Sequence, residues 1–204
     1  MQNSIGEEVE VLTEFKKLMR YLGLEHVPQY HRYQSMAILK YLTKGEQFYA
    51  EDNKSDYIYF LLSGVLRGYT IEQDGKDITD CFLFRYGQAH IGFLNTGESG
   101  FLTERAEAIT DASVMCFEVQ ALSAEIYNSL ELSRLYSAKL MESYVEHWVH
   151  KNVRFRYSAS DRYLWFLKAY PGLIDIVPHK HIASFLGVTP ESLSRLRKNL
   201  REEN

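Results

Sequence analysis

The chain has 204 residues, of which 46% are hydrophobic and 25% are charged. This composition is that of a globular protein with room for one large domain or two small ones, and it excludes a fibrous or disordered chain. The N-terminal segment is acidic and lacks the apolar core of a secretory signal, and no apolar run reaches roughly 18 residues, so we expect a cytoplasmic protein without contact to the membrane.

The formal net charge of −4 is distributed unevenly along the chain. Residues 1–150 contain 13 Lys and Arg against 22 Asp and Glu, whereas residues 151–204 contain 10 against 5. The C-terminal quarter is therefore basic, and the rest of the chain is acidic. A basic tail region suits phosphate binding, although solvated helix faces alone would give the same asymmetry.

The first 120 residues change from a helical to a β-rich pattern. Apolar residues at helical spacing over about 7–23 predict an amphipathic helix that ends at Gly23. From about 35 to 118, short β-rich runs alternate with turn residues, and Asp74-Gly75 between two such runs predicts a type I′ hairpin. Many short strands without a long intervening helix predict a β-sandwich or jelly roll.

The cysteines and aromatic residues suggest core packing more than chemistry. Cys81 and Cys116 stand alone in apolar stretches, which predicts two small buried thiols in a reducing compartment. The 15 Tyr and 11 Phe residues are attributed to the core and to a dimer interface, with an apolar ligand pocket as the alternative.

After about residue 120 the helical spacing returns. Apolar residues recur three or four apart from about Leu130 to Val153, and no Pro or Gly lies between 119 and 170. This predicts one long helix with a break near Tyr157–Ser160. Its apolar stripe needs a partner, either the β domain or a second copy of the helix. The residues assigned to a dimer helix are Leu132, Tyr136, Leu140, Tyr144 and Trp148.

Residues 177–200 predict two short helices joined by a tight turn. Pro178 suits the first turn of the first helix, Gly187 its end, and Thr189-Pro190 the start of the second helix. This spacing is typical of a helix-turn-helix that reads DNA, and a helical hairpin without DNA contact is the alternative. The small and apolar positions that set the crossing of the helices are Ala183, Gly187, Leu193 and Leu196.

The second of these helices has a polar face away from its leucines. Arg can donate twice to guanine and Glu can accept from cytosine, so Glu191 and Arg195 are assigned to base edges; an i,i+4 surface pair is the competing explanation. Basic residues are assigned to phosphates. The full set assigned to DNA is Thr189, Glu191, Ser192, Arg195, Arg197, Lys198 and Arg201, with Lys180 and His181 on the first helix.

The order of an antiparallel β domain, a long helix and a C-terminal helix-turn-helix resembles the CRP/FNR superfamily of bacterial transcription regulators, which includes the cyclic-AMP receptor protein and the fumarate–nitrate regulator. The resemblance covers nearly the whole chain. The segments that carry it are Lys44–Glu46, Tyr57–Tyr69 with Gly64, Asp74–Lys76 and Thr189–Arg197.

The resemblance implies an α+β fold in three parts. These are a cyclic-nucleotide-binding-like jelly roll over residues 1–129, a dimerisation helix over 130–157 and a helix-turn-helix domain over 158–204. It further implies a homodimer on double-stranded DNA with two-fold symmetry, and RNA polymerase and an unidentified small-molecule effector as further partners to consider. No enzyme activity and no cofactor are expected.

This chain departs from the family's pattern at the nucleotide pocket. The family holds the ribose with a Gly-Glu pair and the cyclic phosphate with an Arg that is followed by Ser or Thr. In this chain Gly92 is followed by Phe93, and the place expected for the arginine falls near Leu102-Thr103, with Arg105 slightly later. A buried phosphate without a cationic partner is costly, so no response to cyclic AMP is expected. A loop shift that makes Arg105 the sensor is the alternative.

Other arrangements of side chains point to chemistry less specifically. His147 and His150 are spaced to share a helix face, but two ligands do not make a zinc site, and His179-x-His181 lies outside the β domain, so no metal is expected. A second function class stays open. It is a small-ligand-binding β-barrel sensor whose C-terminal helices mediate protein contacts.

Overall fold

The computed structural model describes residues 2–48, 57–72, 74–91 and 105–202. Two helices, α1 (Gln2–Tyr21) and α2 (Tyr30–Met36), come first and strands follow them. The strands are β1 (Ile38–Leu42), β2 (Gln47–Phe48), β3 (Tyr57–Ser63), β4 (Leu66–Ile71), β5 (Asp77–Leu83), β6 (Ala89–Ile91), β7 (Arg105–Ala108) and β8 (Ala112–Glu118). The remaining helices are α3 (Val119–Asn128), α4 (Leu130–Arg156), α5 (Ala159–Ala169), α6 (Leu173–Ile176), α7 (His179–Leu186) and α8 (Pro190–Glu202).

The strands form two four-stranded antiparallel sheets. Sheet A has the order β1-β8-β3-β6 and sheet B the order β2-β7-β4-β5. At the corner between β3 and β4, Gly64 has a φ of +87°, and a Cβ there would lie 2.4 Å from the carbonyl oxygen of Asp111. Only glycine allows this conformation and this close approach. The mixed α and antiparallel β organisation predicted from the sequence is therefore observed.

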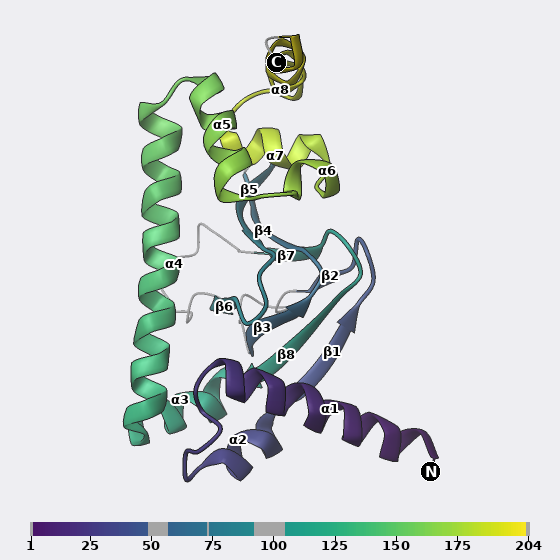
Figure 1. Cartoon of the computed structure of the whole chain (residues 1–204), viewed down its shortest axis with the longest axis vertical. Coiled ribbons are helices and arrows are strands. Elements are labelled where there is room, and N and C mark those ends of the chain that lie inside the picture. Colours follow the sequence, from purple (N-terminus) through teal and green to yellow (C-terminus); the bar gives the residue numbers. More distant parts are fainter. Residues whose placement is uncertain (1, 49–56, 73, 92–104, 203–204) are drawn as a thin grey trace.

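Three apolar layers hold the fold together. One lies between the sheets, and a second lies between the outer face of sheet A and the N-terminal helices with α3 and the start of α4 (Figure 1). The third lies between the outer face of sheet B and helices α5, α6 and α7, where the ring of Phe82 on β5 is centred 5.1 Å from that of Phe185 on α7. The C-terminal helices therefore share a core with the β sheets.

Helix α4 runs along one side of the molecule from α3 to α5, and α8 lies at the far end, beyond α5, α6 and α7 (Figure 1). The expected break near Tyr157–Ser160 is confirmed, since α4 ends at Arg156 and Ser158 caps α5 by accepting a 3.2 Å bond from Asp161 N–H. The sequence did not predict a second break. Ser129 separates α3 from α4, because its hydroxyl accepts a bond from Leu132 N–H and starts a new helix.

Two local expectations need correction. The β4–β5 turn is longer than a two-residue type I′ turn, because Glu72 N–H donates to the carbonyl of Lys76 and leaves three positions between them. Gly75 has the positive φ, +82°, and its N–H donates to Glu72. Cys116 is a buried free thiol whose pKa burial raises to about 12, but Cys81 is only half-buried.

Candidate nucleic-acid interface

Helices α7 and α8 are joined by the short turn Gly187–Thr189 predicted from the sequence. Gly187 has a φ of +64°, and Val188 N–H donates a 2.9 Å bond back to the carbonyl of Ala183, which closes the end of α7. Thr189 caps α8, since its Oγ1 accepts a 3.2 Å bond from Ser192 N–H. Leu193 is buried against α7. The turn and the apolar contact together fix the two helices as one unit.

The polar face of α8 is open to solvent at most of the positions assigned to DNA. Exposed side chains are those of Thr189, Glu191, Arg195 and Lys198, and the half-buried ones are Ser192 and Arg197. Arg195 donates a 3.3 Å bond to Ser192 Oγ, so it stays within its own helix face. The side chain of Arg201 lies outside the described part of the structure.

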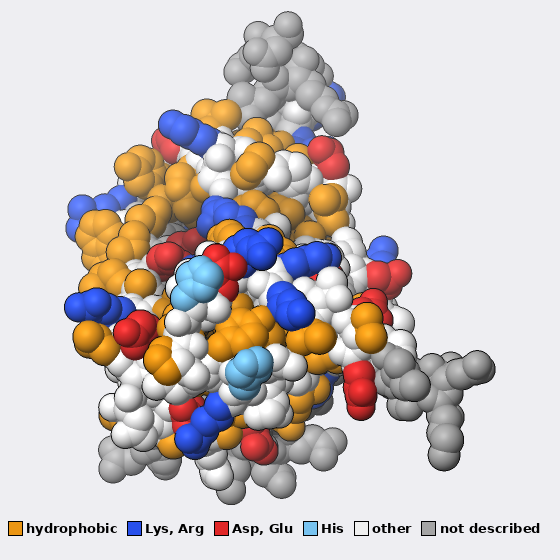
Figure 2. Space-filling model, turned by 60° about the horizontal axis from the view of Figure 1, so that its bottom comes forward, with side chains coloured by type: hydrophobic (Ala, Val, Ile, Leu, Met, Phe, Trp, Pro, Cys, Tyr) orange, Lys and Arg blue, Asp and Glu red, His pale blue; other side chains and the backbone are white. Residues whose placement is uncertain are grey.

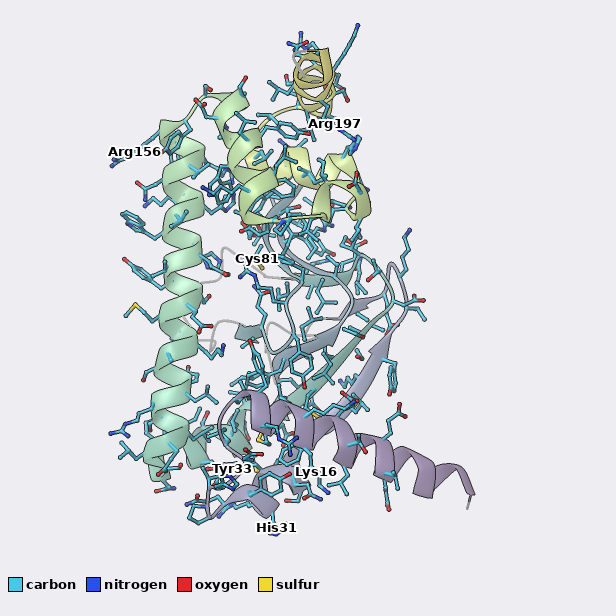
Figure 3. All side chains as sticks on the ribbon, viewed as in Figure 1. Lys16, His31, Tyr33, Cys81, Arg156 and Arg197 are labelled. Carbon is cyan, nitrogen blue, oxygen red and sulfur yellow. The ribbon has the colours of Figure 1, made fainter. Side chains whose placement is uncertain are left out.

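The acidic side chain at the start of this face and the basic side chain of Arg197 have different surroundings. The pKa of Glu191 is lowered, first by its own backbone N–H at the start of α8 and then by Thr189, with Arg195 as a weaker contribution. Arg197 instead contacts the ring of His179 at the start of α7. Figure 3 shows Arg197 between α8 and the helices below it. The structure thus brings Glu191 and Arg195 together on the open face and turns Arg197 toward α7.

The two positions of α7 that were assigned to DNA differ in exposure. Lys180 is exposed, but His181 is only 3% exposed and faces sheet B. The expectation of a phosphate contact for His181 is wrong for this arrangement of the helices. Residues one apart on a helix differ by about 100° in direction, which places one on the surface and the next one inside.

His181 faces a charged cluster on the outer face of sheet B, which is centred on the buried side chain of Arg67. Arg67, 2% exposed, contacts Glu107 at 2.7 Å and Asp77 at 3.2 Å and donates a 3.1 Å bond to Thr79 Oγ1. Burial, followed by the charges of Arg67 and Lys180, lowers the pKa of His181 to about 4 against the opposing charges of Asp77 and Glu107. His181 is therefore neutral at pH 7, where a protonated ring would add a further buried cation.

Ser184 gives α7 a second polar contact with sheet B. Its Oγ accepts a 3.0 Å bond from Thr79 N–H and donates to the carbonyl of Asp77 at 3.4 Å. These backbone groups belong to β5, which is at the edge of sheet B. Helix α7 therefore covers an edge strand and satisfies some of its backbone hydrogen-bonding groups.

Sequence reasoning missed the role of His150, which it considered only as a metal ligand with His147. The structure separates the two: His147 is exposed and contacts the Ser143 carbonyl of its own helix, whereas the Nε2 of His150 lies 2.7 Å from the carbonyl oxygen of Phe185. Burial lowers the pKa of His150 to about 4. Its position on the inward stripe of α4, three residues before Val153, was the available signal.

The dimer-helix residues also divide into two groups. Leu132 is 6% exposed and packs in the core under sheet A, so its assignment to a dimer interface is wrong, and Tyr136 is half-buried against the same core. The remaining three are exposed, Tyr144 by 65%. Three further exposed apolar side chains lie on the same helix. We call the six together the α4 stripe: Leu140, Met141, Tyr144, Val145, Trp148 and Phe155.

Of the effector-pocket positions, Gly92, Phe93 and Thr103 lie outside the described residues. Arg105 begins β7 opposite Tyr69 of β4 and hydrogen-bonds to its side chain. Tyr69 in turn stacks under the guanidinium of Arg67 at 4.2 Å, on the outer face of sheet B. Arg105 is therefore directed to the side of the sheet that faces α7 and away from the layer between the sheets.

The opposite end of the molecule, formed by α1 and α2, carries mixed charges. Figure 2 shows basic and acidic side chains next to each other there. Lys17 pairs with Glu14 at 2.6 Å, and Arg20 pairs with Glu25 at 3.0 Å. These pairs neutralise one another, in contrast to the basic side chains on α8. The α1–α2 end is thus a poor match for a polyanion.

Within the described ranges, no group of three or more His, Cys, Asp or Glu side chains is arranged to hold a metal ion. Among the described helices, none combines the length and the apolar character needed to cross a membrane.

Comparison with known proteins gives a fold but no sequence family. No protein-family model and no curated protein matches the sequence. Among solved structures, FixK2 from Bradyrhizobium japonicum superposes with a TM-score of 0.68 at 22% identity, covering 82% of this chain and 85% of that one. A putative transcriptional regulator of the Crp/Fnr family from Eubacterium rectale gives 0.68 at 16% identity, covering 87% and 84%.

A third similar structure is the c-di-GMP-responsive global regulator CLP from Xanthomonas campestris, with a TM-score of 0.66 at 13% identity, covering 85% of this chain and 90% of that one. The similarity extends over both the β sheets and the C-terminal helices, since each match covers more than four-fifths of this chain. The resemblance inferred from the sequence is confirmed at the level of the fold: the chain has the fold of the CRP/FNR regulators.

Proposed function

We propose that this protein is a cytoplasmic, sequence-specific DNA-binding transcription regulator of the CRP/FNR type. The observation that carries the proposal is the division of α8 into a buried apolar face and an open polar face. Leu193 packs on α7, and Glu191, Arg195 and Lys198 lie on the solvent side. In this proposal α7 and α8 are a helix-turn-helix, and α8 is its recognition helix.

The chemistry of the α8 face suits a DNA major groove. Arg195 has the donors for a bidentate contact to guanine, and Glu191, at the first turn, has the acceptor for the amino group of cytosine. Lys198 and Arg201 are proposed to contact phosphates, and Lys180 extends this set from α7. Arg197 is proposed to contact a phosphate together with His179, on which it rests.

The proposed active form is a homodimer that pairs through α4. The α4 stripe presents large apolar side chains along one side of a 27-residue helix, and Figure 2 shows hydrophobic side chains along the α4 side of the molecule. Such a patch is costly in water, and a second copy of the same helix has a matching surface. Two copies of α8 would then enter successive major grooves, roughly 34 Å apart.

We further propose that the β domain does not respond to cyclic AMP. Phe93 replaces the ribose-binding glutamate, and the place of the phosphate-binding arginine falls near Leu102-Thr103. Arg105, the remaining candidate, hydrogen-bonds Tyr69 on the outer face of sheet B. This position supports the view that it does not serve a ligand between the sheets.

The test is selection of duplexes from a random pool followed by fluorescence anisotropy titrations at low and moderate salt. Arg195→Ala should lower the preference for the selected sequence by about 1–3 kcal/mol, and Lys198→Ala should weaken binding to all sequences alike and reduce the salt slope by about 1. Lys168→Ala, an exposed lysine on α5, is the control. A parent protein that binds no duplex at low salt would contradict the proposal and favour a ligand sensor.

A further inference from the structure

The C-terminal end of α7 is capped by side chains from two other helices. The last carbonyls of a helix have no partner within it. Here the Nε2 of His150 on α4 lies 2.7 Å from the carbonyl oxygen of Phe185. Arg162 on α5 donates from one nitrogen to the carbonyls of Leu186 at 2.7 Å and Gly187 at 3.2 Å. Helices α4 and α5 thus hold α7 at the point where the chain turns into α8.

The contact of His150 is directional. A carbonyl oxygen only accepts hydrogen bonds, so the Nε2 of His150 carries a hydrogen and donates a hydrogen bond to the carbonyl of Phe185. The imidazole also stacks on the ring of Phe185, with centroids 3.8 Å apart and planes 12° from parallel. One hydrogen bond along the ring and one stacking contact across it fix α7 against α4 both in rotation and in translation.

His150 lies on the opposite side of α4 from the α4 stripe. Residues two apart on a helix point about 160° away from each other, and Trp148 of the stripe is 56% exposed while His150 is buried. The same turn of α4 therefore carries the proposed dimer contact on one side and the cap of α7 on the other. An orientation imposed on α4 by its partner copy is passed on to α7 at this point.

The turn between α7 and α8 fixes the orientation of α8 relative to α7. A Cβ at Gly187 would lie 3.1 Å from the Nε of Arg154 and 3.3 Å from a terminal nitrogen of Arg162, so both guanidinium groups pack over the turn. Leu193 is fully buried against α7. Since α8 follows α7 after so short a turn, the direction of α8 is set by the direction of α7.

We propose that His150 and Arg162 are positioning residues that set the angle of α8 relative to α4 and thereby the half-site spacing accepted by the dimer. They contact no DNA. This inference rests on the proposed function, and it adds that spacing specificity is determined on α4 and α5, while base specificity is determined on α8.

The test uses full-length dimers and a symmetric duplex selected from a random pool. Dissociation constants are measured for that duplex, for the same half-sites moved one base pair closer or further apart, and for an isolated half-site. The variants are His150→Leu and Arg162→Gln. Controls are His150→Gln, whose amide can donate over a similar reach, and His147→Leu, the same change at an exposed position of α4.

We expect His150→Leu and Arg162→Gln each to reduce the preference for the selected spacing by about tenfold, the loss expected from one or two hydrogen bonds. Affinity for the isolated half-site should stay within about twofold of the parent, and both controls should retain the parent's spacing preference. A merely structural role would weaken all duplexes equally. Folded variants that keep the parent's spacing preference, or that lose half-site affinity by the same factor, would overturn the proposal.

A second measurement separates failure of this inference from failure of the proposed function. Spin labels on Asn199→Cys, in a Cys81→Ser and Cys116→Ala background, report the distance between the two α8 helices of a dimer without DNA. The parent should give one narrow distribution and Arg162→Gln a broad one. Equal widths contradict positioning by the cap, whereas a parent that selects no duplex contradicts the proposed function alone.

Discussion

The two helices of the α7–α8 unit differ in sequence and lie in opposite environments: half of the residues of α7 are apolar, whereas α8 is mostly polar and basic. Helix α7 is enclosed: sheet B lies on one side of it, and α4 and α5 hold its end through His150 and Arg162. Helix α8 touches the rest of the chain mainly through its leucine face and at Arg197. The difference shows a division of labour in which α7 is an anchor and α8 is free to contact a ligand as large as a duplex.

The β domain contributes the surface on which α7 docks. Helix α7 docks on Phe82, Thr79 and Arg67 of sheet B through an aromatic contact, a backbone hydrogen bond and the charge cluster around Arg67. No comparable platform faces α8 in the described residues. The anchor can therefore be weakened without touching the proposed DNA-contacting surface, and the reverse also holds.

The largest effect is expected for Phe185→Ala, which breaks the anchor. Phe185 is fully buried and its ring contacts His150, Phe82 and Trp165, so its removal should cost about 3–5 kcal/mol of the free energy of unfolding. Urea denaturation followed by circular dichroism measures this. Arg195→Ala, on α8, should change stability by less than about 0.5 kcal/mol. Similar losses in the two variants would contradict the division between anchor and reader.

The next effect is the pH dependence of the anchor. Burial holds the pKa of both His150 and His181 near 4, against 6.5 for an ordinary histidine. Both are neutral when α7 is docked, so their contribution to stability is fully present above about pH 6.5 and is lost as the pH falls toward 4. The loss should be roughly 2–3 kcal/mol for each.

This dependence is measured by urea denaturation between pH 7 and pH 4. The charged groups that act on the pKa of His181 are Arg67, Lys180, Asp77 and Glu107, and those that act on the pKa of His150 are Arg154 and His147. His150→Gln should reduce the slope of stability against pH, and His26→Gln, at an exposed position, should not. An unchanged slope in His150→Gln would show that this histidine is not buried and neutral in solution.

The smallest of the three losses of stability is expected from removing the N-terminal cap of α8. Thr189→Ala removes the side chain that accepts from Ser192 N–H, which should cost about 1 kcal/mol and let the first turn of α8 fray. Ser158→Ala removes the equivalent cap of α5 and is a matched control. The two variants should lose similar stability, but only Thr189→Ala should weaken duplex binding. Equal binding losses would mean that the start of α8 has no special part in DNA contact.

Short-range patterns in the sequence predicted most of the fold. The strands, the long helix and the Gly187 turn depend on periodicity, glycine and caps, and each of these is local. The charged cluster around Arg67 was not predictable, because Arg67, Asp77 and Glu107 are brought together by strand pairing between residues up to 40 apart. His181 was misassigned for the same reason, since its burial depends on sheet B and not on α7.

In the candidate site, too, features that depend on local spacing were predictable, and contacts between distant residues were not. The exposed face of α8 could be read from the spacing of Leu193 and Leu196, so Glu191, Arg195 and Lys198 were identified correctly as surface residues. The role of His150 depends on a contact with Phe185, 35 residues later, and a single histidine on an apolar stripe gives no partner. Leu132 was assigned to a dimer surface because sequence spacing alone does not distinguish the two sides of a helix that is buried at one end.

Photo-crosslinking to a random-sequence duplex measures whether α8 is the helix that enters the DNA groove while α5 stays away from the duplex. A photoreactive amino acid is placed at Ser194 on the exposed face of α8 or at Lys168 on α5. We expect a crosslink from position 194 that weakens as salt is raised, and none from position 168. No crosslink from position 194, or equal yields at both positions, would contradict the assignment of α8 as the recognition helix.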